Sequence, residues 1–98
     1  MAFKLRYTEA AERHLLNLKN DSSKQRILKD VIKALRYMEV NLRHPSLNTH
    51  EYHNLEGPNG EKIFEAYAQQ KTSGAYRIFW YYGPGSNTIS IIAIIPHP

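Results

Sequence analysis

Three β-rich segments near the end of the chain decide the fold: IFEAYAQ at 63–69, YRIFWYY at 76–82 and TISIIAII at 88–95. Short stretches rich in Gly, Pro, Ser and Asn separate them, as turns separate antiparallel strands. The pattern predicts a meander of three strands. Its middle strand contains one charged residue, Arg77, among aromatic and apolar neighbours. Because a guanidinium group is costly to bury, we expect the sheet either to give Arg77 a partner or to leave its face open.

The first half of the chain predicts one strand followed by two helices. Residues 3–7 alternate apolar and basic side chains, the period of a half-buried strand. Thr8 stands where it can cap a helix over residues 9–19. Apolar residues at spacings of three and four over residues 27–42 predict a second helix. We therefore expect an α+β fold of order β-α-α-β-β-β, in which a helix hairpin covers one face of a four-stranded, mainly antiparallel sheet.

Length and composition indicate one domain over residues 1–98. The chain has no cysteine, which excludes disulfides and thiolate metal ligands. It has no apolar run of signal-peptide length, and none of the roughly 20 residues that span a bilayer, so we expect a cytoplasmic protein without a membrane partner. The net charge is +4, and ten of the thirteen Lys and Arg residues lie within residues 1–43. Solvated helix faces explain this basicity, and an RNA or DNA footprint is the alternative.

Residues 44–61 are rich in turn-forming residues and predict a loop that holds His44, His50 and His53. A zinc site needs three or four ligands in a fixed geometry. The other donors in this loop are scattered, so we interpret the histidines as exposed and expect no metal ion and no other cofactor. Tyr52 is expected to anchor the loop on the helix hairpin.

The element order and the segment GAYRIFWY at 74–81 resemble the RelE/ParE superfamily of toxins from bacterial toxin–antitoxin pairs. That family has a Gly-Tyr-Arg-apolar-apolar-Tyr motif in one strand, and this chain has an additional Ala75 after the glycine. The Leu-Glu-Gly segment at 55–57 also fits the family pattern. The final Pro-His-Pro at 96–98 stands where the family often has a Gly-His-Arg or similar cluster. The resemblance covers nearly the whole chain.

This resemblance implies two alternative activities, since fold alone does not fix function. RelE-like members cleave messenger RNA within the ribosome, by attack of a ribose 2′-hydroxyl on the adjacent phosphate. ParE-like members inhibit DNA gyrase. An inactive binding module with the same fold is a third interpretation, because residues 63–69 lack lysines common in RelE-like enzymes and no C-terminal tyrosine follows Pro98.

The resemblance also implies a small antitoxin as partner. Residues 88–95 are apolar at nearly every position, so we expect one face of that strand to expose isoleucines that the antitoxin covers. Without the antitoxin, the chain is expected to form a homo-oligomer or to precipitate.

The candidate site residues come from the resemblance and from strand alternation. Arg77 matches the motif arginine that faces the scissile phosphate, and an ion pair with Glu65 is its structural alternative. Alternation places Glu65, Tyr67, Arg77 and Tyr81 on one open face, where a base can stack on aromatic rings. His97 matches a family position that acts on the substrate, and a frayed terminal residue is the alternative. The candidate catalytic residues are thus Arg77, His97, Glu65 and Tyr81, and the candidate RNA-binding residues are Tyr67 and Arg77.

Overall fold

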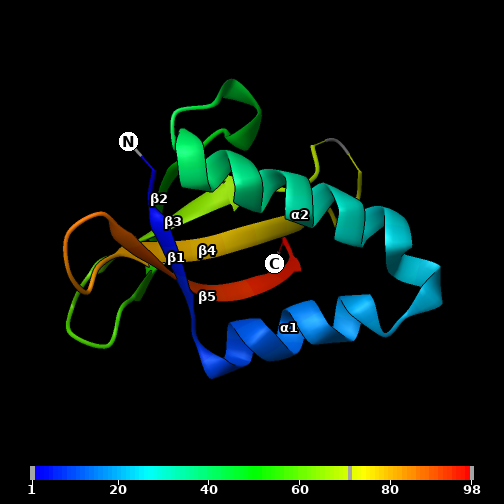
Figure 1. Ribbon diagram of the computed structural model, residues 1–98, viewed down its shortest axis with the longest axis horizontal. Helices are drawn as coiled ribbons and strands as arrows, with labels where there is room; N and C mark the ends of the chain where they lie inside the picture. The colour runs from blue at the N-terminus through cyan, green and yellow to red at the C-terminus, as the bar shows by residue number, and fades with distance from the viewer. Residues whose placement is uncertain (1, 71, 98) are drawn as a thin grey trace.

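Two helices pack on one face of a five-stranded sheet in the computed structural model, which describes residues 2–70 and 72–97 (Figure 1). The elements are β1 (Lys4–Tyr7), α1 (Glu9–Lys19), the 3₁₀ helix η1 (Ser22–Lys24), α2 (Gln25–Val40), the 3₁₀ helix η2 (Pro45–Leu47), β2 (His50–Glu56), β3 (Lys62–Tyr67), β4 (Tyr76–Tyr82) and β5 (Thr88–Pro96). The strands lie in the order β1-β5-β4-β3-β2. β1 is parallel to β5, and the other pairs are antiparallel. The predicted α+β class, with a helix hairpin on a mainly antiparallel sheet, is confirmed.

The sheet has a fifth strand that the sequence analysis did not predict. Most of the segment expected as a loop forms η2 and then β2, which pairs with β3 at the sheet edge. β2 lacks apolar alternation, and its backbone hydrogen bonds to β3 define it instead. Tyr52 does not reach the helices, because its ring packs edge-on against Phe79, with 5.0 Å between the ring centres. This strand places His50 opposite Glu65 of β3.

Local sequence signals account for the helices. The hydroxyl of Thr8 accepts a hydrogen bond from the N–H of Ala11 at 3.2 Å and so caps α1. Asp21 caps the short turn before α2 by accepting from the N–H of Ser23 at 2.9 Å. No helix within the described residues has the length and apolar character needed to cross a membrane.

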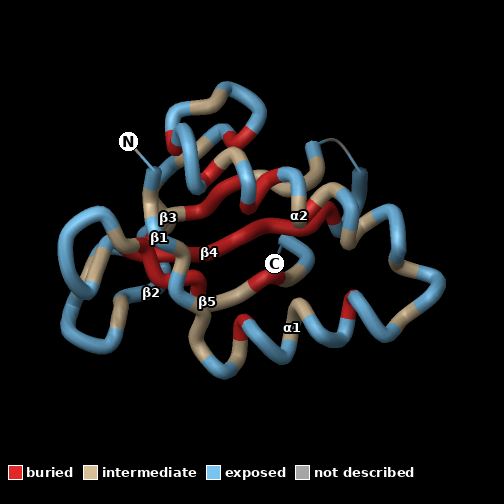
Figure 2. The backbone as a smooth tube through the Cα atoms, viewed as in Figure 1, coloured by how far each residue is buried: buried red, intermediate tan, exposed pale blue. Residues whose placement is uncertain are grey.

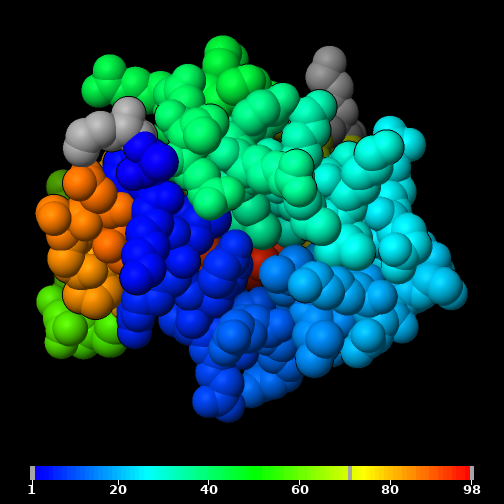
Figure 3. Space-filling view, viewed as in Figure 1, coloured from blue at the N-terminus to red at the C-terminus, as the bar shows by residue number. Residues whose placement is uncertain are grey.

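The main core lies between the helices and the sheet. Its buried side chains include Val31 and Met38 of α2, Trp80 of β4 and Ile91 of β5. Figure 2 shows buried backbone along β4 and on the inner sides of both helices. In Figure 3, α1, α2 and β1 cover this face, and little of β5 is visible between them.

A second, smaller cluster lies on the opposite face of the sheet. Ile63, Phe79 and Tyr81 are buried there, and Ile92 and Ile95 are half-buried against them. The strand β5 is interior to the sheet, between β1 and β4. The expectation that β5 exposes isoleucine side chains is therefore wrong, since its neighbours bury or half-bury each of them.

Candidate functional site

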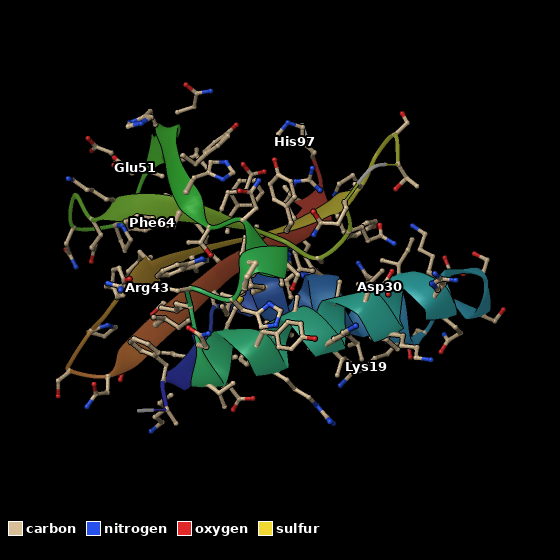
Figure 4. All side chains as sticks on the ribbon, turned by 90° about the horizontal axis from the view of Figure 1, so that it is seen from above. Lys19, Asp30, Arg43, Glu51, Phe64 and His97 are labelled. Atoms are coloured by element: carbon tan, nitrogen blue, oxygen red, sulfur yellow. The ribbon has the colours of Figure 1, made fainter. Side chains whose placement is uncertain are left out.

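The polar residues of β3 and β4 share the face that is turned away from the helices. Tyr67 pairs directly with Arg77, and Glu65 pairs with Phe79. Directly paired residues of antiparallel strands project to the same side of a sheet. The alternation predicted for Glu65, Tyr67 and Arg77 is thus what the structure has. In Figure 4 the labelled His97 and Glu51 lie on this side of the sheet, opposite Lys19 and Asp30 on the helix side.

Glu65 is the centre of a buried hydrogen-bonded cluster. Its side chain is 2% exposed. One carboxylate oxygen lies 2.9 Å from Nε2 of His50, and the other lies 3.0 Å from Nδ1 of His97. Nε of Arg77 lies 3.6 Å from this second oxygen. A buried carboxylate needs partners of this kind, because an ionised group without them is strongly disfavoured in a protein interior.

Arg77 is held by the protein on every side. Its side chain is 8% exposed, and Nη1 donates to the carbonyl oxygens of Gln69 at 2.7 Å and Tyr76 at 3.3 Å. The ring of Tyr67 lies over the guanidinium, 3.6 Å from Cζ. Nε has no hydrogen-bond partner among the described residues, so its contact with Glu65 is an ion pair without a hydrogen bond. The expected open surface at Arg77 is therefore absent, because Tyr67 and the β3–β4 connection close over it.

His97 is anchored at the end of β5. Its backbone N–H donates to the carbonyl of Ala75 at 2.8 Å, and its ring contacts Glu65. The side chain remains 49% exposed. His97 is thus an ordered residue of the cluster and not a frayed end. One side of its ring contacts the buried carboxylate of Glu65, and the rest of the ring is open to solvent.

Tyr81 belongs to a different part of the same face. It is 4% exposed and packs with Ile63 and Phe79 in the smaller apolar cluster. Within residues 2–70 and 72–97, no hydrogen bond or ring contact joins it to Glu65 or Arg77. The structure therefore brings Glu65, Tyr67, Arg77 and His97 together and leaves Tyr81 in an apolar contact.

His50 is a residue of this cluster that the sequence did not predict. It stands on β2 opposite Glu65 in register, and its ring meets the edge of Tyr67, with 5.8 Å between the ring centres. Its side chain is 44% exposed. The spacing of His50 from neighbouring histidines carried no signal for this role. Only the pairing of β2 with β3 places it on the carboxylate.

The other two loop histidines serve local contacts. His44 stacks on Tyr37, with 3.7 Å between the ring centres, and its Nδ1 lies 2.7 Å from the hydroxyl of Ser46. His53 lies 3.3 Å from Glu51 and is exposed. Among the described residues, no three His, Cys, Asp or Glu side chains are arranged to bind a metal ion.

Tyr67 of the cluster also lines a groove of about 550 Å³. It runs between α2 and the end of β3, and Arg26, Lys33 and Tyr37 line its α2 wall. Gln69 closes part of the opposite wall and donates to Asp30 at 3.1 Å. Cationic and aromatic side chains of this kind suit a nucleotide.

Comparisons with known proteins agree on the fold. The structure is similar to a YoeB/ParE toxin from Agrobacterium tumefaciens, with a TM-score of 0.69 and 10% sequence identity over 98% of this chain and 100% of that one. It is similar to YoeB in a dimer from Staphylococcus aureus, with a TM-score of 0.64 and 13% identity over the whole of both chains. It is also similar to a chain of the archaeal RelE–RelB complex from Pyrococcus horikoshii, with a TM-score of 0.64 and 12% identity over 98% of this chain and 96% of that one. Neither a protein-family profile nor a curated protein sequence matches the chain.

Proposed function

The chain has the fold of the RelE/ParE toxin superfamily, and we propose that it is the toxin of a type II toxin–antitoxin pair. We propose further that it is a RelE-like endonuclease that cleaves messenger RNA on the ribosome, in the cytoplasm, without a metal ion. The observation that carries this second step is His97, a half-exposed histidine whose Nδ1 lies 3.0 Å from a buried carboxylate. A carboxylate in this position orients a histidine ring for proton transfer.

Each residue of the cluster has its own role in this proposal. His97 is the group that meets the RNA, since its ring reaches solvent. Glu65 is a positioning residue, because both its oxygens are occupied and 2% of its side chain is exposed. Arg77 holds Glu65 from beneath, and Tyr67 offers a ring on which a base can stack. Tyr81 contributes through packing.

A gyrase-directed toxin is the second candidate, and one observation favours it. Arg77 is buried, and no other Lys or Arg lies with it in the Glu65 cluster among the described residues. RNA cleavage requires a cation near the phosphate, which would then come from the groove beside α2 or from the ribosome. An inactive module with this fold is the third candidate.

Expression of the chain alone tests the three candidates. We expect growth arrest and new RNA 5′ ends within codons of a translated message, mapped by primer extension. His97→Ala should abolish both, and His53→Ala, which changes an exposed histidine outside the cluster, should abolish neither. Arrest with DNA-damage signalling and no new 5′ ends would establish the gyrase candidate. Absence of arrest would establish the inactive module.

We propose an antitoxin as the stable partner of the chain. The archaeal neighbour was solved as a RelE–RelB complex, and the staphylococcal neighbour as a dimer. The exposed apolar side chains of this chain, Leu16, Val40, Leu55 and Tyr82, are spread over several elements. Co-expression with a small acidic protein encoded beside it should give a soluble complex, whereas the chain alone should self-associate in light scattering. A soluble monomer that does not bind its neighbour would refute this partner.

A further inference from the structure

The ring of His50 has an oxygen acceptor at each nitrogen. Nδ1 lies 2.7 Å from the carbonyl oxygen of Asn48, and Nε2 lies 2.9 Å from a carboxylate oxygen of Glu65. A carbonyl oxygen can only accept a hydrogen bond, so Nδ1 must carry a proton. At Nε2 the bonding proton belongs either to the ring or to the carboxyl group.

Arg77 decides between these two possibilities. Its guanidinium is always charged, and Nε lies 3.6 Å from Glu65 while the rest of the group is enclosed by protein. A buried guanidinium without a partner is strongly disfavoured, so the group that pairs with it here is a carboxylate. An ionised carboxylate only accepts hydrogen bonds, so Nε2 of His50 also carries a proton. In this arrangement His50 therefore donates a hydrogen bond from each ring nitrogen, and 44% of its side chain is exposed.

The position of the proton on the ring of His97 follows in the same way. Its Nδ1 lies 3.0 Å from the ionised carboxylate and must donate to it. The proton of a neutral His97 therefore sits on Nδ1, and Nε2 keeps its lone pair. We propose that His50 is a positioning residue of this site: its two donated hydrogen bonds hold Glu65 in the orientation that selects this tautomer of His97.

The surroundings of His50 support this assignment. The carbonyl that it binds belongs to Asn48, whose left-handed backbone, with φ of 45°, ends η2. The hydroxyl of Thr49 binds the carbonyl of Leu42 at 3.1 Å, which ties the segment to the end of α2. Arg77 contacts Glu65 within the cluster and Tyr67 meets the ring of His50, whereas Glu51 on β2 is paired with His53.

This part of the inference rests on the proposed nuclease function. With its proton on Nδ1, His97 can accept a proton from the RNA at Nε2. The ribose 2′-oxygen bonds to phosphorus as its proton passes to Nε2 of His97, and the P–O5′ bond breaks to leave a 2′,3′-cyclic phosphate. The leaving 5′-oxygen takes a proton from water, and the hydroxide so formed takes the proton back from His97. The imidazolium formed on His97 is stabilised by Glu65. His50 touches none of the reacting atoms and acts through the carboxylate.

Nitrogen-15 NMR of the histidine rings tests this assignment in the purified chain, without ribosomes or RNA. His50 should show a hydrogen-bonded proton on Nε2 as well as on Nδ1, and the neutral ring of His97 should carry its proton on Nδ1. His50→Ala should remove the tautomer selection and leave a mixture at His97. His50→Gln, which retains an N–H donor for Glu65, should restore it, and His53→Ala should change nothing.

Two results would overturn the proposal. One is a neutral His97 ring that carries its proton on Nε2 in the unaltered chain. The other is an unchanged His97 signature in a folded His50→Ala variant. Neither result depends on RNA cleavage, so a failure of the proposed function is separable from a failure of this inference.

Discussion

The ring of Tyr67 lies over the guanidinium of Arg77, with 3.6 Å between the ring centre and Cζ. The two residues are also direct partners across β3 and β4. The arginine thus has an aromatic cover, a carbonyl acceptor in Gln69 and a carboxylate in Glu65. Its charge is satisfied within the protein, so we expect Arg77 to contribute to the stability of this face of the sheet.

Arg77→Ala should therefore destabilise the fold. The change removes a buried cation from Glu65 and from the carbonyl of Gln69, and loss of one partner of a buried ion pair costs about 3–5 kcal/mol. Chemical denaturation should show this loss, and Arg36→Ala on the exposed side of α2 should stay within about 0.5 kcal/mol of the unaltered chain. Arg77→Lys should lose an intermediate amount, because an ammonium cannot reproduce the planar contacts. An Arg77→Ala variant as stable as the unaltered chain would show that the arginine is not structural.

Replacement of both members of the buried pair should cost less than the two single replacements predict. Glu65→Leu leaves Arg77 without its carboxylate, and Arg77→Leu leaves Glu65 with only half-exposed histidines. The double variant leaves no uncompensated buried charge. A double-mutant cycle should give a favourable coupling energy of about 1–3 kcal/mol between the two positions. Strictly additive losses would show that the residues do not act as a pair.

The polar face could be predicted from the sequence because strands alternate their side chains. The regular spacing of Glu65 and Tyr67 on β3 assigned both to one side, and Arg77 followed once the two strands were paired. The burial of Arg77 could not be predicted in this way. It depends on the orientation of the Tyr67 ring and on the carbonyl of Gln69, and neither leaves a periodic signal in the sequence.

The strand β2 shows a different limit of sequence reasoning. Its residues are polar or exposed on both faces, so no alternation distinguishes them from a loop. The strand exists because β3 offers it a backbone ladder, with His50 opposite Glu65. Without that pairing, His50 was one of three loop histidines, although it completes the carboxylate cluster. Strand alternation therefore located Tyr67 and Arg77, the family resemblance located His97, and neither located His50 on the edge strand.

The cap of α1 makes a separate prediction about stability. Thr8 accepts from the N–H of Ala11 at 3.2 Å, and its hydroxyl lies 3.4 Å from the carbonyl of Ile92. Thr8→Ala should cost about 1 kcal/mol, because it leaves a first-turn N–H of the helix without a side-chain acceptor. Thr8→Ser should retain most of the stability, since it keeps the hydroxyl. Equal losses from both variants in thermal unfolding would assign the effect to the lost methyl group instead.

His14 accepts a hydrogen bond from a backbone N–H of β5 that β1 does not reach. The strand β1 ends at Tyr7, opposite Ile91, so it does not reach the N–H of Ile94. That N–H donates instead to Nδ1 of His14 at 3.2 Å. Burial lowers the pKa of His14 below its ordinary value of 6.5, and the positive charge of Arg13 lowers it further. The folded protein therefore favours the neutral ring, whose lone pair accepts this hydrogen bond.

The free energy of unfolding should decrease as the pH falls below 6.5 and passes through the lowered pKa of His14. The unfolded chain binds the proton at the higher pH, so protonation favours unfolding within this window, and the stabilisation is fully present only above it. His14→Gln retains an acceptor for the N–H of Ile94 but does not titrate. As the pH falls, the free energy of unfolding of this variant should therefore decrease less steeply than that of the unaltered chain. The other histidines are the same in both proteins and contribute equally to both curves. Chemical denaturation at a series of pH values measures the difference, with His53→Gln as the control at an exposed position. Parallel curves for His14→Gln and the unaltered chain would show that His14 has the same pKa in both states.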